Sequence, residues 1–355
     1  MRRFLPKSLG LNPNFNLTGY ADMKGCSCKV PQVKLQEYLR DVGIDMSQME
    51  SPDSSIVPVG NGMVLCSTTD FFNPCVADPY LQGQIAACNV LSDLYALGIS
   101  TCTNMLMVLA VSKLIDENDK KIATSQMMKG FNDMATKAGT TVTGGQSIIN
   151  PWPIIGGVGM SVVPETQVIY PRGAQPGDML VLTKPLGCQL AVNLYEWFYY
   201  KPHQLEKLTT KPSEEIVNEI FNKACDSMGS LNRKAAELMH KYGSKGATDV
   251  TGFGILGHSR NLASVQHADV DIVIHTLPTF AGAIQFDKQV HNYRFIEGFS
   301  AETSGGLLVI LPRENAQSYI DDFERQEGRQ AWIVGEVVPG TKQARVVENP
   351  KIINV

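Results

Sequence analysis

Short apolar runs alternate with segments of helical periodicity over the first half of the chain, and this alternation is typical of an α/β unit. Strands are predicted where apolar and β-branched residues stand together, and helices where apolar residues recur every three or four positions. The predicted strands are 63–69, 104–111 and 154–163, and the predicted helices are 33–42, 80–97 and 125–138. Gly98 follows the second of these helices and is expected to cap it, because glycine readily adopts the left-handed conformation that ends helices.

A polar, proline-containing stretch over residues 164–176 interrupts this pattern and is the predicted linker between two domains. Shortly before it, Gly144, Gly145 and Gln146 are predicted to lie in a turn. After it, the chain mixes predicted strands at 179–182, 272–275, 307–311 and 332–338 with helices such as 213–242. We therefore expect an α/β and α+β protein in three parts: a flexible arm over residues 1–50, a first domain over 51–170 and a second over 171–355.

Composition narrows the class of protein. A chain of 355 residues is too long for one ordinary hydrophobic core, so two domains with a cleft between them are expected. Hydrophobic residues make up 43% and charged residues 19%, as in soluble globular proteins, and the net charge of −4 provides no basic surface for nucleic acid. Eight scattered cysteines, and the lack of a signal-like or membrane-spanning run, lead us to expect a reduced, cytoplasmic protein.

The first candidate chemistry is the N-terminal run Gly25-Cys26-Ser27-Cys28-Lys29. The positive charge of Lys29 can favour the thiolate form of Cys26, and the same ammonium can bind a phosphate. A buried or metal-binding pair of cysteines is an equally good interpretation of these residues alone. The run therefore predicts reactive sulfur chemistry only if the rest of the chain supports it.

Four aspartates stand where a side chain can be presented to a site. Asp53 lies in a polar turn, Asp70 ends the first predicted strand, and Asp249 lies in a run of small residues. Asp93 lies within the helix 80–97, on the same face as Asn89 four residues earlier. Carboxylates are ligands of Mg²⁺, which usually binds to proteins together with substrate phosphates. Each aspartate taken alone is as often, or more often, a helix cap or a surface charge.

Other features carry less information. The pairs Gly144-Gly145 and Gly305-Gly306 fit no phosphate-binding or dinucleotide-binding spacing and are typical of turns. His258 lacks the matched cysteine or histidine spacing of a metal site, so a structural role is the better interpretation of its sequence context.

The order of the motifs along the chain resembles that of the selenophosphate synthetase family. The resemblance extends from about residue 18 to the C-terminus. It rests on the runs Gly25-Cys26-Ser27-Cys28-Lys29, Ser67-Thr68-Thr69-Asp70, Asn89-Val90-Leu91-Ser92-Asp93, Thr143-Gly144-Gly145-Gln146 and Thr248-Asp249-Val250-Thr251-Gly252-Phe253-Gly254. Each run is a weak signal by itself, but their shared order over most of the chain is specific.

The resemblance implies an enzyme that converts selenide, ATP and water into selenophosphate, AMP and orthophosphate, for selenocysteine and selenouridine synthesis. It also implies the two-domain fold shared with aminoimidazole ribonucleotide synthetase, a homodimer, and Mg²⁺ as the cofactor with ATP as co-substrate. A monovalent cation such as K⁺ and a selenium-delivery protein as partner are left open. Neither nucleic acid nor a membrane is expected as a partner.

The site residues implied by the resemblance are those at positions that match the family motifs. Cys26 matches the redox-active residue, and Lys29 matches the essential lysine of the same arm. The metal-binding positions are matched by Asp53, Asp93 and Asp249, and the ATP-binding positions by Lys29, Asp70, Asp93, Gly144, Gly145 and Gln146.

Two differences from many bacterial members of the family remove neither a ligand nor a nucleophile: Ser27 replaces glycine, and Gln146 replaces histidine. Three other interpretations stay open. A paralogue could keep the nucleotide site without making selenophosphate, although Cys26 argues against it. An ATP enzyme of purine or thiamine metabolism with the same fold would not need the Cys-x-Cys-Lys arm. A non-catalytic selenium-binding or regulatory protein would bind selenide without ATP turnover.

Overall fold

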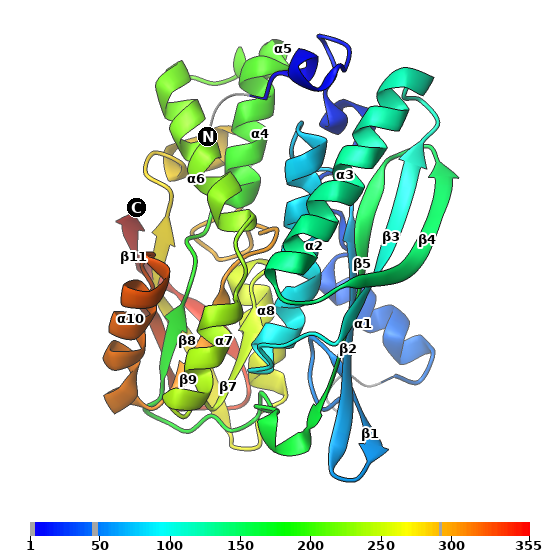
Figure 1. The fold of residues 1–355 in the computed structure, drawn as a ribbon. Coiled ribbons are helices and arrows are strands. Elements are labelled where there is room, and N and C mark those ends of the chain that lie inside the picture. Colours follow the sequence, from blue (N-terminus) through cyan, green and yellow to red (C-terminus); the bar gives the residue numbers. More distant parts are fainter. Residues whose placement is uncertain (1–3, 45–48, 291–292) are drawn as a thin grey trace.

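The computed structural model describes residues 4–44, 49–290 and 293–355, and Figure 1 shows two units of sheet and helices side by side. The first unit holds a five-stranded sheet in the order β1-β2-β5-β3-β4. Its strands are β1 (Ser55–Gly60), β2 (Met63–Phe72), β3 (Asn104–Ser112), β4 (Val142–Asn150) and β5 (Ile154–Pro164). Neighbouring strands are antiparallel, except that β3 and β4 are parallel.

Two long helices cover one face of this sheet (Figure 1), α2 (Pro79–Ala96) and α3 (Glu117–Lys137). Asp78 caps α2 by accepting a hydrogen bond of 2.9 Å from the backbone N–H of Tyr80, and Gly98 follows the helix with a φ of +73°, as predicted. Nearly every residue of α2 is buried. The polar side chains of Asn89 and Asp93 are therefore carried into the interior, where they need partners or a ligand.

The other face of the first sheet is open. Strand register places Val57, Phe71, Ile148 and Val162 on this face, one each from β1, β2, β4 and β5. Their side chains are 44–54% exposed. An exposed apolar sheet face of this kind is unusual, because the water-facing positions of a strand with one buried face are normally polar.

The second unit is built on a six-stranded sheet in the order β11-β8-β10-β6-β9-β7. Its strands are β6 (Met179–Leu182), β7 (Gly246–Asp249), β8 (Val270–Thr279), β9 (Leu307–Leu311), β10 (Trp332–Pro339) and β11 (Ala344–Asn354). The helices of this half are α4 (Cys188–Tyr199), α5 (Pro202–Leu205), α6 (Glu214–Met228), α7 (Arg233–Lys241), α8 (Gly254–Ser264), α9 (Ile284–Val290) and α10 (Arg313–Glu327). Among the described strands of this sheet, only β11 and β8 pair in parallel.

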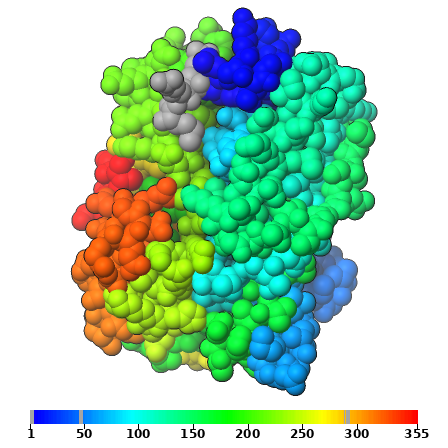
Figure 2. Space-filling model, in the orientation of Figure 1, coloured from blue at the N-terminus to red at the C-terminus, as the bar shows by residue number. Residues whose placement is uncertain are grey.

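Both faces of the second sheet are buried at β6, so this strand is apolar at every position. Met179 and Val181 pack into a core shared with the first unit, whereas Leu180 and Leu182 pack into a separate core beneath α8. In Figure 2 the side chains of the two units are in contact over much of their boundary. The shared core holds the two units together around α2.

The N-terminal segment contains the 3₁₀ turns η1 (Pro6–Leu9), η2 (Leu17–Tyr20) and η3 (Cys26–Cys28), followed by helix α1 (Gln32–Asp41), close to the predicted helix. A further turn, η5 (Glu165–Gln167), follows β5. An isolated β-bridge joins Gly25 to Asn73. No helix in the described residues is both long enough and apolar enough to cross a membrane.

Two sequence predictions were wrong for reasons that lie in tertiary contacts. The predicted turn around Gly144 to Gln146 is part of strand β4, and Gly145 is required there because a Cβ atom would lie 1.9 Å from the carbonyl oxygen of Met107. The predicted helix 213–242 is divided into α6 and α7. At the break, the side chain of Asn232 donates hydrogen bonds to Ser92 in α2 and to the carbonyl of Gly305. The helix α3 also begins before its predicted start.

Candidate functional site

A cavity of about 320 Å³ lies where the N-terminal segment, the first sheet and the second unit meet. Its walls come from the segment after η3, the residues before β1, the end of β2, helix α2 and the segment from β7 to α8. The lining residues are Lys29, Val30, Leu35, Pro52, Asp53, Thr69, Asp70, Asp93, Asp249, Thr251, Phe253, His258 and Asn261. The structure thus brings Lys29 and all four candidate aspartates to one cavity.

Asp53, Asp70 and Asp93 are held in an environment that disfavours the charge of their carboxylates. Burial, followed by the charge of Asp249, raises the pKa of Asp53 well above its usual range. Burial also raises the pKa of Asp70, against the effect of Lys29, and raises that of Asp93, where Asp249 and then Asp70 add to the shift. Burial lowers the pKa of Lys29, but the surrounding carboxylates, Asp70 foremost, outweigh it and raise the pKa overall. Additional positive charge in the cavity would therefore stabilise the ionised form of these carboxylates.

Several ligand atoms in the cavity have no internal partner. Asp53 Oδ1 accepts a hydrogen bond of 3.0 Å from Thr248 Oγ1. Asp53 Oδ2, Asp249 Oδ2 and His258 Nδ1 are buried, and none has a hydrogen-bond partner among the residues that the structure describes. One ligand atom each from Asp53, Asp249 and His258 forms a group in which all atoms lie within 4.8 Å of one another. Two aspartates and a histidine at this spacing, with a buried oxygen of each aspartate left unpartnered, fit a divalent cation such as Mg²⁺.

Asp70 and Asp93 are oriented by their neighbours. Asn89 Nδ2 donates a hydrogen bond of 2.8 Å to Asp70 Oδ2, while Lys29 Nζ lies 3.5 Å from Asp70 Oδ1. The hydroxyl of Thr68 donates to Asp93 Oδ2. Thr68 and Asp70 both lie on the buried face of β2, two residues apart, so the strand itself aims them at the same side. These contacts fix the directions in which the two carboxylates can meet a ligand.

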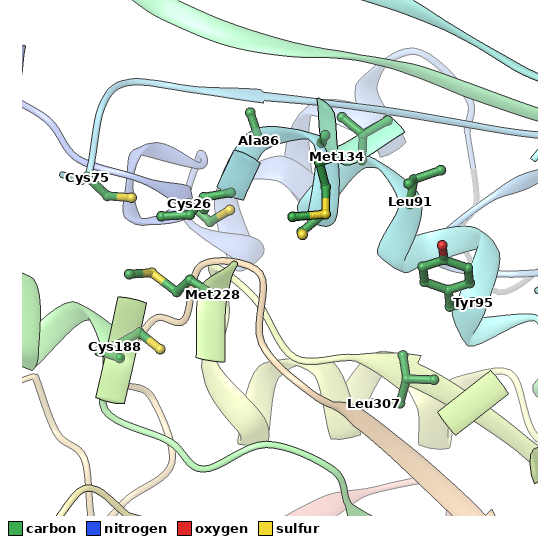
Figure 3. Close-up of a cluster of buried hydrophobic side chains, with 14 of the residues drawn as sticks. Cys26, Cys75, Ala86, Leu91, Tyr95, Met134, Cys188, Met228 and Leu307 are labelled. Carbon is green, nitrogen blue, oxygen red and sulfur yellow. The ribbon is translucent and has the colours of Figure 1, made fainter. Parts of the chain in front are cut away.

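Cys26 lies beside this cavity rather than on its wall, and it is completely buried. Its backbone N–H donates to Thr303 Oγ1 at 3.0 Å, and its thiol donates to Asn89 Oδ1 at 3.4 Å. The backbone N–H of Ser304 donates to the same Asn89 oxygen at 2.8 Å. Figure 3 shows Cys26 within a cluster of buried side chains that also holds Cys75 and Cys188.

The protonation state of Cys26 differs from the thiolate that the neighbouring Lys29 suggested in the sequence. Lys29 does act to lower the pKa of the Cys26 thiol, as its position predicted, but burial is the larger effect and raises the pKa well above its usual range. In this conformation the residue is a thiol that donates to Asn89. Cys28 is only half-buried, and burial raises its pKa as well.

A second set of contacts joins Lys29 to the loop between β7 and α8. Lys29 Nζ donates to Thr251 Oγ1 at 3.4 Å, and that hydroxyl lies 3.1 Å from His258 Nε2. Burial, with the charge of Lys29 as a smaller cause, lowers the pKa of His258 to about 3, so its imidazole is neutral near pH 7. The N-terminal segment lies against this loop at Gly252, where a Cβ atom would be 2.3 Å from the carbonyl oxygen of Cys26.

Gly144, Gly145 and Gln146 are not brought to this cavity within one chain. They lie on β4, which is separated from β2 by two other strands, and they are absent from the cavity lining. Sequence reasoning also missed Thr68, Thr251 and the role of Asn89 as a bridge between Cys26 and Asp70. The four-residue spacing of Asn89 and Asp93 was the only available signal for the last of these.

Family models and known relatives match this chain over nearly its whole length. Family models described as AIR synthase related protein match residues 51–163, as the N-terminal domain, and residues 175–348, as the C-terminal domain. The chain is 51% identical to the selenide, water dikinase of Trypanosoma brucei brucei, covering 95% of this chain and 88% of the relative. It is 44% identical to selenide, water dikinase 2 of Homo sapiens, covering 100% and 87%, respectively.

Solved structures with the same fold are more distant in sequence. Thiamine monophosphate kinase from Aquifex aeolicus is similar with a TM-score of 0.60 and 18% identity, covering 91% of this chain and 96% of that chain. The hydrogenase maturation protein HypE in complex with ATP is similar with a TM-score of 0.59 and 15% identity, covering 93% of each chain. At these identities the similarity establishes the fold.

Proposed function

The chain belongs to the selenide, water dikinase family and makes selenophosphate from selenide and ATP, and we propose that the cavity around Lys29 is where the phosphoryl group is transferred. The observation that carries this proposal is the convergence of Lys29 and four aspartates, from separate parts of the chain, on one cavity. The full reaction that we propose converts selenide, ATP and water into selenophosphate, AMP and orthophosphate.

Asp53, Asp93 and Asp249 are proposed to hold Mg²⁺. A polyphosphate would be repelled by several carboxylates, and the unpartnered oxygens of Asp53 and Asp249 are suited to an ion placed between the two. When bound, Mg²⁺ neutralises charge on the phosphates and orients them for in-line transfer. In the absence of the ion, burial raises the pKa of Asp53 and that of Asp93, so metal binding and proton release should be linked at these two carboxyls.

Lys29 is proposed to stabilise the negative charge of the transferred phosphoryl group. Its raised pKa keeps the ammonium charged, and its contacts with Asp70 and Thr251 hold it at the cavity wall. Asp70 in turn is fixed by Asn89, so the lysine and the nucleotide-facing carboxylate are positioned together. The N-terminal segment, packed against Gly252, would exclude water from the transfer step.

Cys26 is proposed to be the thiol that acts on selenium. In the closed arrangement its thiol is buried and donates to Asn89. Contact with selenide therefore requires the segment around Cys26 to open and close again, a motion of the kind that often limits turnover. We place this arm over residues 1–50, the first domain over 51–170 and the second over 171–355. A separate selenium-delivery protein would act at the open stage, in a cytoplasmic setting.

We also propose that two copies of the chain pair through the open face of the first sheet. Val57, Phe71 and Val162 give this face an apolar surface. Gln146 pairs with Val108 in register and lies on the same side as Phe71, next to the exposed Ile148. A second copy seated on this face could therefore bring its own Gly144 to Gln146 toward the nucleotide. Sedimentation velocity of a Phe71→Glu variant should show monomers if this pairing is correct.

The test of the proposed reaction is anaerobic ³¹P NMR of the full chain with Mg²⁺, ATP and selenide, beside a control without selenide. We expect a selenophosphate signal to appear together with equal amounts of AMP and orthophosphate. The control should show neither selenophosphate nor matching AMP.

Two outcomes would contradict the proposal. Release of ADP as the final nucleotide product would indicate a different ATP-dependent reaction of the same fold. Binding of selenide without any turnover of ATP would indicate a regulatory or selenium-binding protein, and Cys26 would then need another role.

A further inference from the structure

We propose that His258 is a direct ligand of a divalent cation held by Asp53 and Asp249, and that it gives this position a preference for Mn²⁺ over Mg²⁺. The inference rests on the proposed function for the presence of a cation in the cavity. It goes further by naming an imidazole as a ligand and by stating how this ligand changes the metal preference of the site.

The side chain of His258 is placed at the two carboxylates by the backbone around it. Helix α8 begins at Gly254, whose φ is +70° and where a Cβ atom would lie 2.5 Å from the carbonyl oxygen of Gly298. This tight turn directs the first turn of α8 back toward the end of β7, where Asp249 stands. His258 consequently lines the same cavity as Asp249, although the two are nine positions apart in the sequence.

The state of the imidazole is unusual for a purely structural histidine. His258 is 4% exposed, and its Nδ1 atom has no hydrogen-bond partner within the described parts of the chain. A buried polar atom without a partner costs free energy unless a ligand satisfies it. One oxygen each of Asp53 and Asp249 is in the same condition. The three residues thus meet at one place, because one ligand atom from each lies within 4.8 Å of the other two.

The mixed ligand set determines which metal fits. Two ligands on opposite sides of a cation with bonds of about 2.1 Å are about 4.2 Å apart, so this group needs only a small inward movement to close on an ion. Mg²⁺ prefers oxygen ligands and keeps much of its water, whereas imidazole nitrogen suits first-row transition metals. Two carboxylates and one imidazole therefore favour Mn²⁺ more than three carboxylates would.

A competing interpretation is that His258 acts only through Thr251. Its Nε2 atom lies 3.1 Å from the Thr251 hydroxyl and 3.4 Å from the backbone nitrogen of Phe253. A histidine in that role would hold Thr251, and through it Lys29, without touching a metal. The two interpretations differ in one measurable property, the presence of a metal–nitrogen bond.

The experiment uses Mn²⁺ alone as the probe, with the full chain and no nucleotide. Bound and free Mn²⁺ are counted by EPR in a titration, and the bound ion is then examined by electron spin echo envelope modulation for coupling to nitrogen. We expect ¹⁴N coupling in the natural protein and its replacement by the ¹⁵N pattern when histidine is labelled with ¹⁵N. This measurement needs no variant, so it does not depend on a substituted protein folding.

The variant His258→Gln should lose the nitrogen coupling and bind Mn²⁺ about tenfold or more weakly. Its affinity for Mg²⁺, measured by competition, should change less than its affinity for Mn²⁺. The matched control is His275→Gln on β8, where the imidazole contacts Thr276 and lies outside the cavity lining. That variant should keep both the coupling and the affinity.

The possible failures are distinct. If Mn²⁺ binds but shows only oxygen ligands, or if the coupling persists in His258→Gln, the assignment of His258 is overturned while the proposed metal site stands. If no Mn²⁺ binds to the natural protein, the metal site of the proposed function fails and the assignment of His258 fails with it.

Discussion

The carboxylate side of the site and its thiol side differ in how fully their polar atoms are paired. On the carboxylate side, Asp53 and Asp249 each leave a buried oxygen without a partner in the described residues. On the thiol side, Cys26 is enclosed and its backbone and thiol both donate hydrogen bonds. Unpaired buried atoms indicate a place prepared for a ligand, whereas paired ones indicate a conformation held closed.

Asn89 joins these two sides. Its carbonyl oxygen accepts from Cys26 and from the backbone of Ser304, and its nitrogen donates to Asp70. A movement of the Cys26 segment should therefore alter the position of the Asp70 carboxylate. In turn, a nucleotide bound at Asp70 should alter the position of Cys26. The comparison between the two sides can be tested by substitutions that act on only one of them.

The largest effect is expected on the thiol side, from Cys26→Ser. Selenide-dependent formation of selenophosphate should fall by about a thousandfold or more, because the proposed reactive sulfur is lost. Mg²⁺-ATP affinity, measured by equilibrium dialysis, should remain nearly unchanged, because Cys26 does not line the cavity and a serine hydroxyl can still donate to Asn89, which keeps Asp70 in place. Cys28→Ser is the matched control and should be tolerated better. If the ranking of the two variants is reversed, Cys28 is the functional thiol.

A smaller effect is expected on the carboxylate side, from Asp93→Ala. Removal of a proposed metal ligand should weaken Mg²⁺-ATP binding by about tenfold to a hundredfold. The measurement is calorimetric titration of nucleotide at fixed Mg²⁺. Asp133→Ala on the surface of α3, where the carboxylate pairs with Lys129, should leave the affinity as it was. Unchanged affinity in Asp93→Ala would remove Asp93 from the metal site.

The smallest effect is expected on stability, from Asp53→Asn in the absence of metal. Burial raises the pKa of Asp53 in the folded state above its value of about 3.9 in the unfolded chain. Between these two pKa values the folded state holds a proton that the unfolded state has released, so the free energy of unfolding contributed by Asp53 falls as pH rises through that range. The amide variant has no such loss.

In EDTA, and at pH values above this range, the free energy of unfolding of Asp53→Asn should therefore exceed that of the natural protein by about 1–3 kcal/mol. The gain should vanish below about pH 4. Adding Mg²⁺ should reverse the order at neutral pH. Thermal unfolding at several pH values, with and without Mg²⁺, provides the measurement. A variant that is less stable than the natural protein in EDTA would mean that the carboxylate is already satisfied without a metal.

Local pattern alone determined much of this protein. The strand 63–69, the helix 80–97 with Gly98 after it, and the strands 104–111 and 154–163 were predicted close to their observed bounds. The spacing of apolar residues and the glycine that ends the helix are local features that can be recognised in the sequence. Short motifs in a particular order along the chain also identify the candidate residues Lys29, Asp53, Asp70, Asp93 and Asp249. These residues do meet at one cavity.

Tertiary structure decided what depends on distant contacts. No local signal places Gly145 against β3, divides the helix 213–242 at Asn232, or turns His258 toward Asp53. The protonation of Cys26 is of the same kind, because the charge of Lys29 can be read from the sequence but the stronger effect of burial cannot. Burial is a property of everything that packs around a group, and those neighbours come from all along the chain.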